Sequence, residues 1–257
     1  MRIFYVFIVV LSLLVSACSE YARVVKNDDY KRKYELGLKL FEQENYPKSI
    51  TLLEQVYQRT PKTSEGENSY YSLGIANYRL GDYYTAQYYL ASFGDKYPTS
   101  VKREETSFLY ALCSVNNSPS ASLDQAETET ALNELQLFIY KFPQSDRIDT
   151  CNKLMDQLRF KLQYKDYESL KVYDRTENYK AAIVTSETFL KEFPVSIYRE
   201  NVWEILINNS YQLAKHSVED KKKERIDKTM ERYSKFVLEF PNSERSEELK
   251  NLIGRLI

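Results

Sequence analysis

Residues 70–98, YYSLGIANYRLGDYYTAQYYLASFGDKYP, decide the fold of this chain. Apolar and small residues recur at helical spacing on both sides of Gly81, and Pro98 ends the second helical segment. Gly74 and Ala86 leave room for two antiparallel helices to approach closely, while Gly81 suits the positive φ of a helix end. The stretch therefore predicts a helix–turn–helix unit, which needs neighbours because it cannot bury its own apolar face.

The unit resembles the tetratricopeptide repeat, which is a helix–turn–helix of about 34 residues. The small, tyrosine, small, bulky and proline positions of that repeat are filled by Gly74, Tyr83, Ala86, Phe93 and Pro98. Similar helix ends recur along the chain: a proline ends an apolar segment, and a hydroxyl residue two positions later is a candidate N-cap. These pairs are Pro61 and Thr63, Pro98 and Ser100, Pro143 and Ser145, Pro194 and Ser196, and Pro241 and Ser243. We expect an all-α fold, a right-handed tetratricopeptide-repeat superhelix of about five helix pairs plus a C-terminal capping helix.

The amino terminus has the pattern of an export signal. Met1 and Arg2 precede the apolar run 3–15, which is shorter than the roughly 20 residues of a membrane span. The next residues, Val15-Ser16-Ala17-Cys18, resemble the bacterial lipobox. The resemblance implies cleavage before Cys18 and lipid on its thiol and new amino group, with the outer membrane favoured because no aspartate follows. An ordinary secretion signal that happens to carry a cysteine is the alternative.

The expected organisation has four parts. They are a lipoprotein signal peptide over 1–17, a lipidated polar tether over 18–28, N-terminal repeats over 29–145, and C-terminal repeats with a capping helix over 146–257. The later repeats are expected to carry longer helices or loops, since the intervals between the five prolines are 37, 45, 51 and 47 residues. The mixed-charge run 219–225 is expected to form an exposed joint, to which an acidic or lipid-headgroup partner could bind.

Composition argues against several classes of function. A formal net charge of −1 gives no global attraction to nucleic acid. His216 is the only histidine and lies at a predicted helix end, where a solvated cap is more common than a catalytic base. The sequence has no glycine-rich phosphate loop and no metal-spaced His/Cys cluster, so we predict neither catalytic nor metal-binding residues and no cofactor. Cys113 and Cys151 could form a disulfide in an oxidising compartment or pack as small apolar groups.

The first helices of the first two repeats carry a candidate binding surface. Tyr34, Leu38 and Phe41 share one helical face, and Tyr71, Ile75, Tyr78 and Arg79 repeat the spacing. In tetratricopeptide proteins this face lines the concave groove. The resemblance implies a groove, edged by Lys31, Glu42 and Arg79, that suits an extended peptide with an aromatic residue and a carboxylate. The alternative is that these side chains only pack repeat against repeat.

The lipobox, the five units, the proline–serine helix ends and the segment LFEQENYPKSI (residues 40–50) together resemble the BamD family. That family is the lipoprotein subunit of the outer-membrane β-barrel assembly machine. The resemblance implies a scaffold at the periplasmic face of the outer membrane that binds unfolded β-barrel precursors and the barrel-forming subunit. By the pattern P-x-S-x-x-R it places Arg199 at the contact with that subunit, whereas Trp203 is expected in the core.

Two other classes stay open. A different tetratricopeptide lipoprotein that scaffolds cell-envelope or division enzymes would share these features. An enzyme carried on a helical scaffold would need a catalytic constellation that the sequence does not show.

Overall fold

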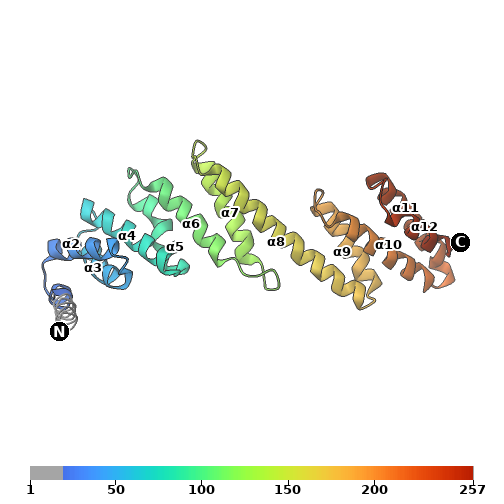
Figure 1. Ribbon diagram of the computed structural model, residues 1–257, viewed down its shortest axis with the longest axis horizontal. Coiled ribbons are helices and arrows are strands. Elements are labelled where there is room, and N and C mark those ends of the chain that lie inside the picture. The colour runs from blue at the N-terminus through green and yellow to red at the C-terminus, as the bar shows by residue number, and fades with distance from the viewer. Residues whose placement is uncertain (1–19, 257) are drawn as a thin grey trace, which may run out of the picture. The chain divides into compact units, whose positions relative to one another are not determined.

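The computed structural model describes residues 20–256, and these form helices joined by turns, without a β-strand among them (Figure 1). The labelled helices are α2 (Tyr30–Glu42), α3 (Tyr46–Arg59), α4 (Ser64–Leu80), α5 (Tyr83–Lys96), α6 (Arg103–Asn117), α7 (Ala126–Lys141), α8 (Ile148–Arg175), α9 (Tyr179–Glu192), α10 (Arg199–Lys215), α11 (Glu219–Glu239) and α12 (Arg245–Gly254). The expected all-α fold of five helix pairs followed by a last helix is confirmed.

The chain divides into two compact units. Of the described residues, one unit comprises 20–120 together with 124–155, and the other comprises 121–123 with 156–256. The division falls inside α8, later in the chain than the expected boundary after residue 145. The proline–serine pairs mark where helices end, and a helix as long as α8 can contain a boundary that no such pair marks.

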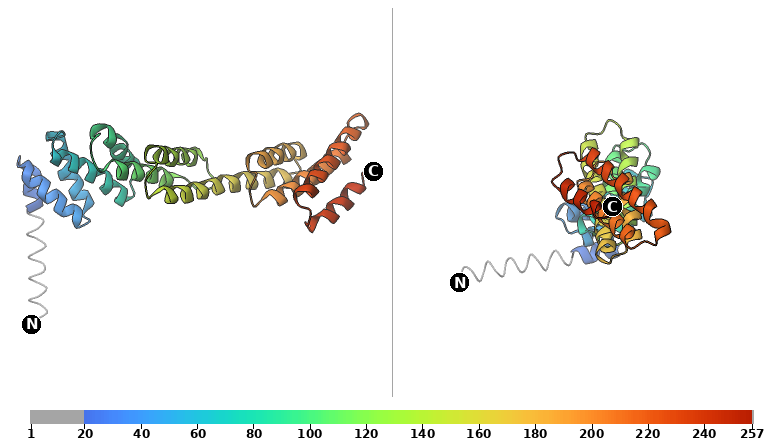
Figure 2. Two further views of the ribbon diagram at one scale, coloured as in Figure 1. Left: turned by 90° about the horizontal axis from the view of Figure 1, so that it is seen from above. Right: turned by 90° about the vertical axis from the view of Figure 1, so that its right-hand side faces the viewer.

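Within the first unit, each helix packs against the next one from α2 to α7, and first helices also touch, α2 with α4 and α4 with α6. In the second unit α9 packs on α10 and α10 on α11, while α12 lies against both α10 and α11 (Figure 2). Leu249 and Ile253 of α12 are buried in one cluster with Trp203 and Phe236. The last helix therefore covers the apolar face that the fifth pair would otherwise expose.

Glycine permits the close approach of the two helices in each of the first two repeats. A β-carbon on Gly74 would lie 2.8 Å from Leu90 Cδ2, and one on Gly37 would lie 2.8 Å from Leu53 Cδ2. Neither distance is compatible with a side chain at the glycine unless the leucine moves. The predicted role of Gly74 is confirmed, and the first repeat uses the same contact.

The hydroxyl residues after the prolines behave in two ways. Thr63 caps α4 as predicted, because its side chain accepts a hydrogen bond from Gly66 N at 3.1 Å. Ser100 does not cap α6, whose N-cap is Lys102, since a turn separates the serine from the helix. Instead, Ser100 Oγ donates to Glu67 Oε1 of the preceding repeat at 2.7 Å. Equivalent bonds join Ser145 to Glu104 and Ser243 to Glu200. Three of the predicted caps thus link successive repeats.

Two expectations about irregular segments are corrected. Residues 20–26 of the expected tether are helical, and Val24 is only 4% exposed because it packs on Leu36, Leu40 and Leu52. The mixed-charge run 219–225 is not a joint but the beginning of α11. The run carries charges of both signs, and helical pairs such as Lys222 with Glu219 support the helix. Cys18 lies outside the described residues.

Three turns within repeats need a residue in the left-handed region. Gly81 has φ 78° as predicted, while Glu44 has φ 58° and Glu177 has φ 55° at the corresponding turns. A side chain there costs about 1–2 kcal/mol, and glycine removes that cost at a loss of about 0.5–1 kcal/mol in chain entropy. We expect Glu44→Gly and Glu177→Gly each to raise the free energy of unfolding by about 0.5–1 kcal/mol in urea denaturation.

Glu42→Gly is the matched control, because Glu42 is a helical residue of α2. This change should lower the free energy of unfolding by roughly 0.5–1 kcal/mol. If Glu44→Gly destabilised the protein as much as the control does, the left-handed turn would not be a source of strain.

Candidate functional site

A cavity of about 450 Å³ lies in the first repeat, where α2, α3 and the start of α4 meet. The helix α2 supplies most of its lining from two adjacent turns. The lining residues are Tyr30, Lys31, Tyr34, Glu35, Val56, Thr60 and Glu65. Of these, Tyr34 and Lys31 were predicted as a groove residue and an edge residue.

The two tyrosines of this cavity are held in place by neighbouring polar groups. Tyr30 is the first residue of α2, whose N-cap Asp29 accepts a hydrogen bond from Arg32 N. Lys33 Nζ lies 5.0 Å from the centre of the Tyr30 ring and also donates to Gln55. The Tyr34 hydroxyl accepts a hydrogen bond from Asn68 Nδ2 at 3.0 Å. Both rings are therefore fixed before any ligand arrives, which lowers the entropy cost of binding.

The charged residues around the cavity differ in whether they form ion pairs. Glu35 faces Arg32 at 3.4 Å, whereas Lys31 is exposed and has no ion pair among the described residues. Val56, which is 1% exposed, supplies an apolar wall. The cavity thus combines two rings, an apolar wall and one available cation, a set that can hold an aromatic side chain beside a carboxylate.

The other predicted groove residues lie together at the contact between repeats. Ile75 is buried in a cluster with Leu90 and Cys113, and Phe41, Tyr71 and Tyr78 pack against that cluster. Tyr71 donates its hydroxyl hydrogen to Glu105 Oε2 at 2.8 Å, and Lys102 Nζ lies 4.5 Å from its ring centre. These contacts agree with the alternative given in the sequence analysis, that the side chains pack one repeat against the next. Leu38 is half-buried and Arg79 is exposed.

Burial determines the protonation of these tyrosines. Desolvation is the main cause that raises the pKa of Tyr71, and the hydrogen bond to Glu105 raises it further. Desolvation likewise raises the pKa of Tyr78. Both phenols are therefore neutral near pH 7, and Tyr71 can act as the donor to Glu105.

Sequence reasoning missed five residues of the cavity, namely Tyr30, Glu35, Val56, Thr60 and Glu65. A signal was available for Tyr30, which precedes Tyr34 by one helical turn and so shares its face. Thr60 and Glu65 lie on either side of the turn between α3 and α4, and helical periodicity carries no information about such a turn.

Arg199, the predicted contact with a partner, is bound within the chain. Its Nε donates to Glu239 Oε1 at 2.5 Å and its Nη2 to Glu239 Oε2 at 2.9 Å, while Nη1 donates to the carbonyls of Leu190 and Phe193. The side chain is 14% exposed. Trp203, which is buried as expected, also donates to Glu239 Oε2 at 2.9 Å. The donors of Arg199 thus bind the ends of α9 and α11, and its contact with a partner stays a prediction.

The remaining candidates for chemistry are structural. Cys113 and Cys151 are free and buried, so the packing alternative holds in this structure, and burial raises the pKa of Cys113 to about 12. His216 caps α10, with Nδ1 2.9 Å from Gln212 O. Across residues 20–256, no three His, Cys, Asp or Glu side chains gather as metal ligands would. None of the described helices combines the length and apolarity needed to cross a bilayer.

The Arg199–Glu239 pair generates a test of stability. Arg199→Ala leaves the partly buried Glu239 carboxylate with only the hydrogen bond from Trp203 and takes the same donor from two carbonyls, so it should lower the free energy of unfolding by about 2 kcal/mol at pH 7. The hydrogen bond from Arg199 is the main cause that lowers the pKa of Glu239. The pair's contribution to the free energy of unfolding is therefore complete above the pKa of the carboxyl in the unfolded chain, which is about 4.3. It is lost as the pH falls through the lower pKa of Glu239 in the folded protein.

Urea denaturation at pH 7 and at pH 3 measures the difference in free energy of unfolding between the wild type and Arg199→Ala. This difference should be smaller at pH 3. Arg159→Ala is the control, because Arg159 pairs with Asp156 on an exposed helix face and should change stability by less than about 0.5 kcal/mol. Equal, small effects of the two substitutions would contradict the internal role of Arg199.

Comparison with known proteins adds the family. The family model described as "Outer membrane lipoprotein" (YfiO) matches residues 26–225. Two solved structures of the nearly identical TPR-like repeats assigned to a kinesin light chain of Podosopora anserina also match. The first is 13% identical over 80% of this chain and 94% of that chain with a TM-score of 0.34. The second is 12% identical over 88% and 93% with a TM-score of 0.33.

At these TM-scores, neither similarity supports an inference about this protein. The search of curated proteins found no match. The family match covers well over half of the chain. The protein therefore belongs to the outer membrane lipoprotein (YfiO) family.

Proposed function

We propose that the protein is a BamD-like, lipid-anchored scaffold of the outer-membrane β-barrel assembly machine, and that its first repeat binds segments of unfolded β-barrel precursors. The observation that carries this proposal is the cavity around Tyr30 and Tyr34 with Lys31 beside it, in a member of an outer membrane lipoprotein family. Its mechanism is non-covalent, since binding requires only rings, an apolar wall and a cation.

The cavity favours one kind of peptide end. A space of about 450 Å³ accommodates one or two large side chains, so an aromatic residue can lie between Tyr30, Tyr34 and Val56. Lys31 can then pair with a terminal carboxylate. Glu35 and Glu65 repel further acidic groups, which selects a peptide with a single carboxylate over an acidic segment.

The proposed surface continues from this cavity towards the second repeat. Along α2 the same helical face carries Leu38 and Phe41, and the second repeat adds Tyr71, Ile75, Tyr78 and Arg79. Since Ile75 is buried, an extended peptide would contact mainly the half-buried rings and the exposed Arg79. Docking of the barrel-forming subunit is proposed for residues 146–257, where Arg199 would have to exchange an internal hydrogen bond for one to the partner.

The packed segment 20–26 supports a short distance between the proposed lipid anchor at Cys18 and the cavity of the first repeat. Val24 attaches this segment to α2 and α3, and Glu20 follows Cys18 by only two residues. Two extended residues reach at most about 7 Å. Acyl chains on Cys18 would therefore hold the first repeat next to the bilayer surface, without a flexible spacer between them.

Peptide binding tests the cavity. We use a ten-residue peptide that ends in phenylalanine with a free carboxylate, and the same peptide with a C-terminal amide. Lys31→Glu should weaken binding of the acid roughly 5-fold, and Tyr34→Ala should weaken binding of both peptides roughly tenfold in calorimetry. Tyr34→Phe should retain most of the affinity, because the ring remains.

Tyr84→Ala is the control for loss of a tyrosine, since Tyr84 is 68% exposed on α5 and does not line the cavity. Circular dichroism verifies the fold of each variant. The proposal fails if acid and amide bind the wild type equally well, or if Tyr84→Ala weakens binding as much as Tyr34→Ala does.

Fractionation tests the anchor. Cys18→Ser should leave the signal uncleaved and unlipidated and move the protein from the detergent phase to the aqueous phase, because the acyl chains supply the stable membrane attachment. Ser19→Ala is the control and should keep the wild-type distribution. An unchanged membrane fraction for Cys18→Ser would exclude lipidation at this cysteine.

A further inference from the structure

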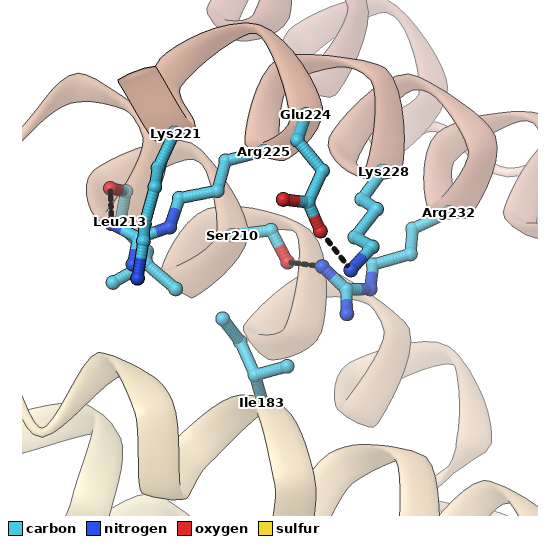
Figure 3. A pocket seen from close by; sticks show the side chains of 8 residues that line it. All are labelled: Ile183, Ser210, Leu213, Lys221, Glu224, Arg225, Lys228 and Arg232. Atoms are coloured by element: carbon cyan, nitrogen blue, oxygen red, sulfur yellow. Dashed lines mark hydrogen bonds and ion pairs between the residues drawn. The ribbon is translucent and has the colours of Figure 1, made fainter. Parts of the chain in front are cut away.

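A second cavity, of about 290 Å³, lies in the second unit between α9, α10 and α11 (Figure 3). Four cationic side chains of α11 line it, spaced by three or four residues so that they share one helical face. They are Lys221, Arg225, Lys228 and Arg232. The rest of the lining is Ile183 from α9, Ser210 and Leu213 from α10, and Glu224.

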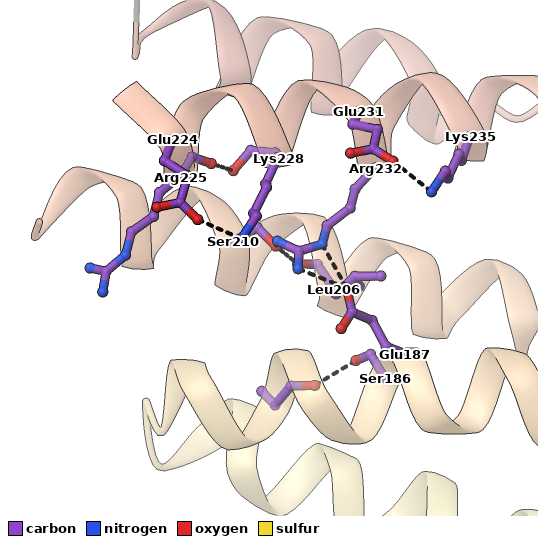
Figure 4. Close-up of polar contacts among 12 residues, drawn as sticks. Ser186, Glu187, Leu206, Ser210, Glu224, Arg225, Lys228, Glu231, Arg232 and Lys235 are labelled. Carbon is purple, nitrogen blue, oxygen red and sulfur yellow. Dashed lines mark hydrogen bonds and ion pairs between the residues drawn. The ribbon is translucent and has the colours of Figure 1, made fainter. Parts of the chain in front are cut away.

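The two arginines of this cavity are oriented by neighbouring oxygen atoms. Arg232 Nη1 donates to Ser210 Oγ at 3.0 Å, and its Nη2 donates to Glu187 Oε1 at 2.7 Å (Figure 4). Arg225 Nη1 donates to Ser217 Oγ at 2.6 Å. These bonds hold both guanidinium groups at the cavity before a ligand binds.

The positive charge at this cavity exceeds the negative charge. Lys228 pairs with Glu224 at 2.6 Å and Arg232 with Glu187 at 2.7 Å. Arg225 and Lys221 form no ion pair with any described residue. Like charges on one helical face disfavour the helix, so this arrangement is costly without an anion. Two positive charges are left for a ligand.

We propose that this cavity binds a phosphate group, as inorganic phosphate or as a phosphate monoester. A phosphate dianion carries two charges and several acceptor oxygens, which match the two unpaired cations and the N–H groups of the arginines. A carboxylate carries one charge and would need only one of these cations. Ile183 points from α9 towards the cations, and with Leu213 it offers an apolar contact for the organic part of an ester (Figure 3).

The test is a calorimetric titration of the detergent-solubilised full-length protein with inorganic phosphate at constant ionic strength. Binding should saturate at millimolar concentrations or below, be displaced by sulfate and not by chloride, and weaken from pH 7.5 to pH 5.5 as phosphate loses its second charge. A linear, non-saturating response would overturn the proposal.

A pair of double variants assigns the binding to the cavity. Lys221→Gln with Lys228→Gln should weaken phosphate binding at least tenfold. Lys223→Gln with Lys235→Gln removes the same charge from the same helix, again from one unpaired lysine and one in an i,i+4 ion pair, but neither residue lines the cavity. This control should bind as the wild type does. Equal losses in both variants would show a general charge effect and overturn the proposal.

Three further probes separate the sources of the anion. Vesicles containing phosphatidic acid, compared with pure phosphatidylcholine vesicles, should bind through Lys221 and Lys228 and be displaced by inorganic phosphate if a lipid phosphate enters the cavity. Vesicle binding that inorganic phosphate does not displace, together with no direct phosphate binding, overturns the proposal. A glutamate-rich peptide that binds through the same lysines while phosphate does not would identify a protein carboxylate as the ligand instead.

Discussion

The structure depends on a geometric constraint: no helix pair can bury its apolar face alone, so each must pack closely within itself and then against the next pair. Close packing within the pair comes from the absent side chains of Gly37 and Gly74, which let Leu53 and Leu90 reach the opposite helix. Packing between pairs comes from side chains that reach across, such as Ile75 into the cluster with Cys113. Serine–glutamate hydrogen bonds such as that of Ser100 with Glu67 add direction to contacts that are otherwise only apolar.

Much of this could be predicted because helical period and helix ends are local properties. The sequence around Gly81 and Pro98 predicts both helices of the second repeat and the left-handed turn between them. Predictions about residues 20–26 and 219–225 were wrong because polar, charged sequences suit a loop and an exposed helix equally well. In both segments tertiary contacts decide, through Val24 in the first and through the cations of α11 that face α10 in the second.

The candidate sites were harder to predict, since a helical face shows which side chains lie together but not what they meet. Tyr34 and Tyr71 occupy corresponding faces of α2 and α4, and each hydroxyl is hydrogen-bonded to the following repeat, yet Tyr34 lines a cavity while Tyr71 packs against a buried cluster. Both helices have the first helix of the next repeat beside them, α4 beside α2 and α6 beside α4, so the neighbour alone does not decide whether a cavity remains. Helical periodicity is the same in α2 and α4 and could not predict which of the two faces would leave a space.

Sequence also does not show whether an arginine binds a partner or a group within its own chain. Its planar group suits a partner's carboxylate, but it suits an internal carboxylate and the carbonyls of a helix end equally well, and sequence cannot distinguish the two. Arg199 is satisfied by Glu239, Leu190 and Phe193, so a partner would have to replace bonds that already exist. Arg225 has a serine hydroxyl and no carboxylate, and it lies beside the unpaired Lys221. A ligand gains most where charge is uncompensated, and in the second unit that criterion favours the face of α11 over Arg199.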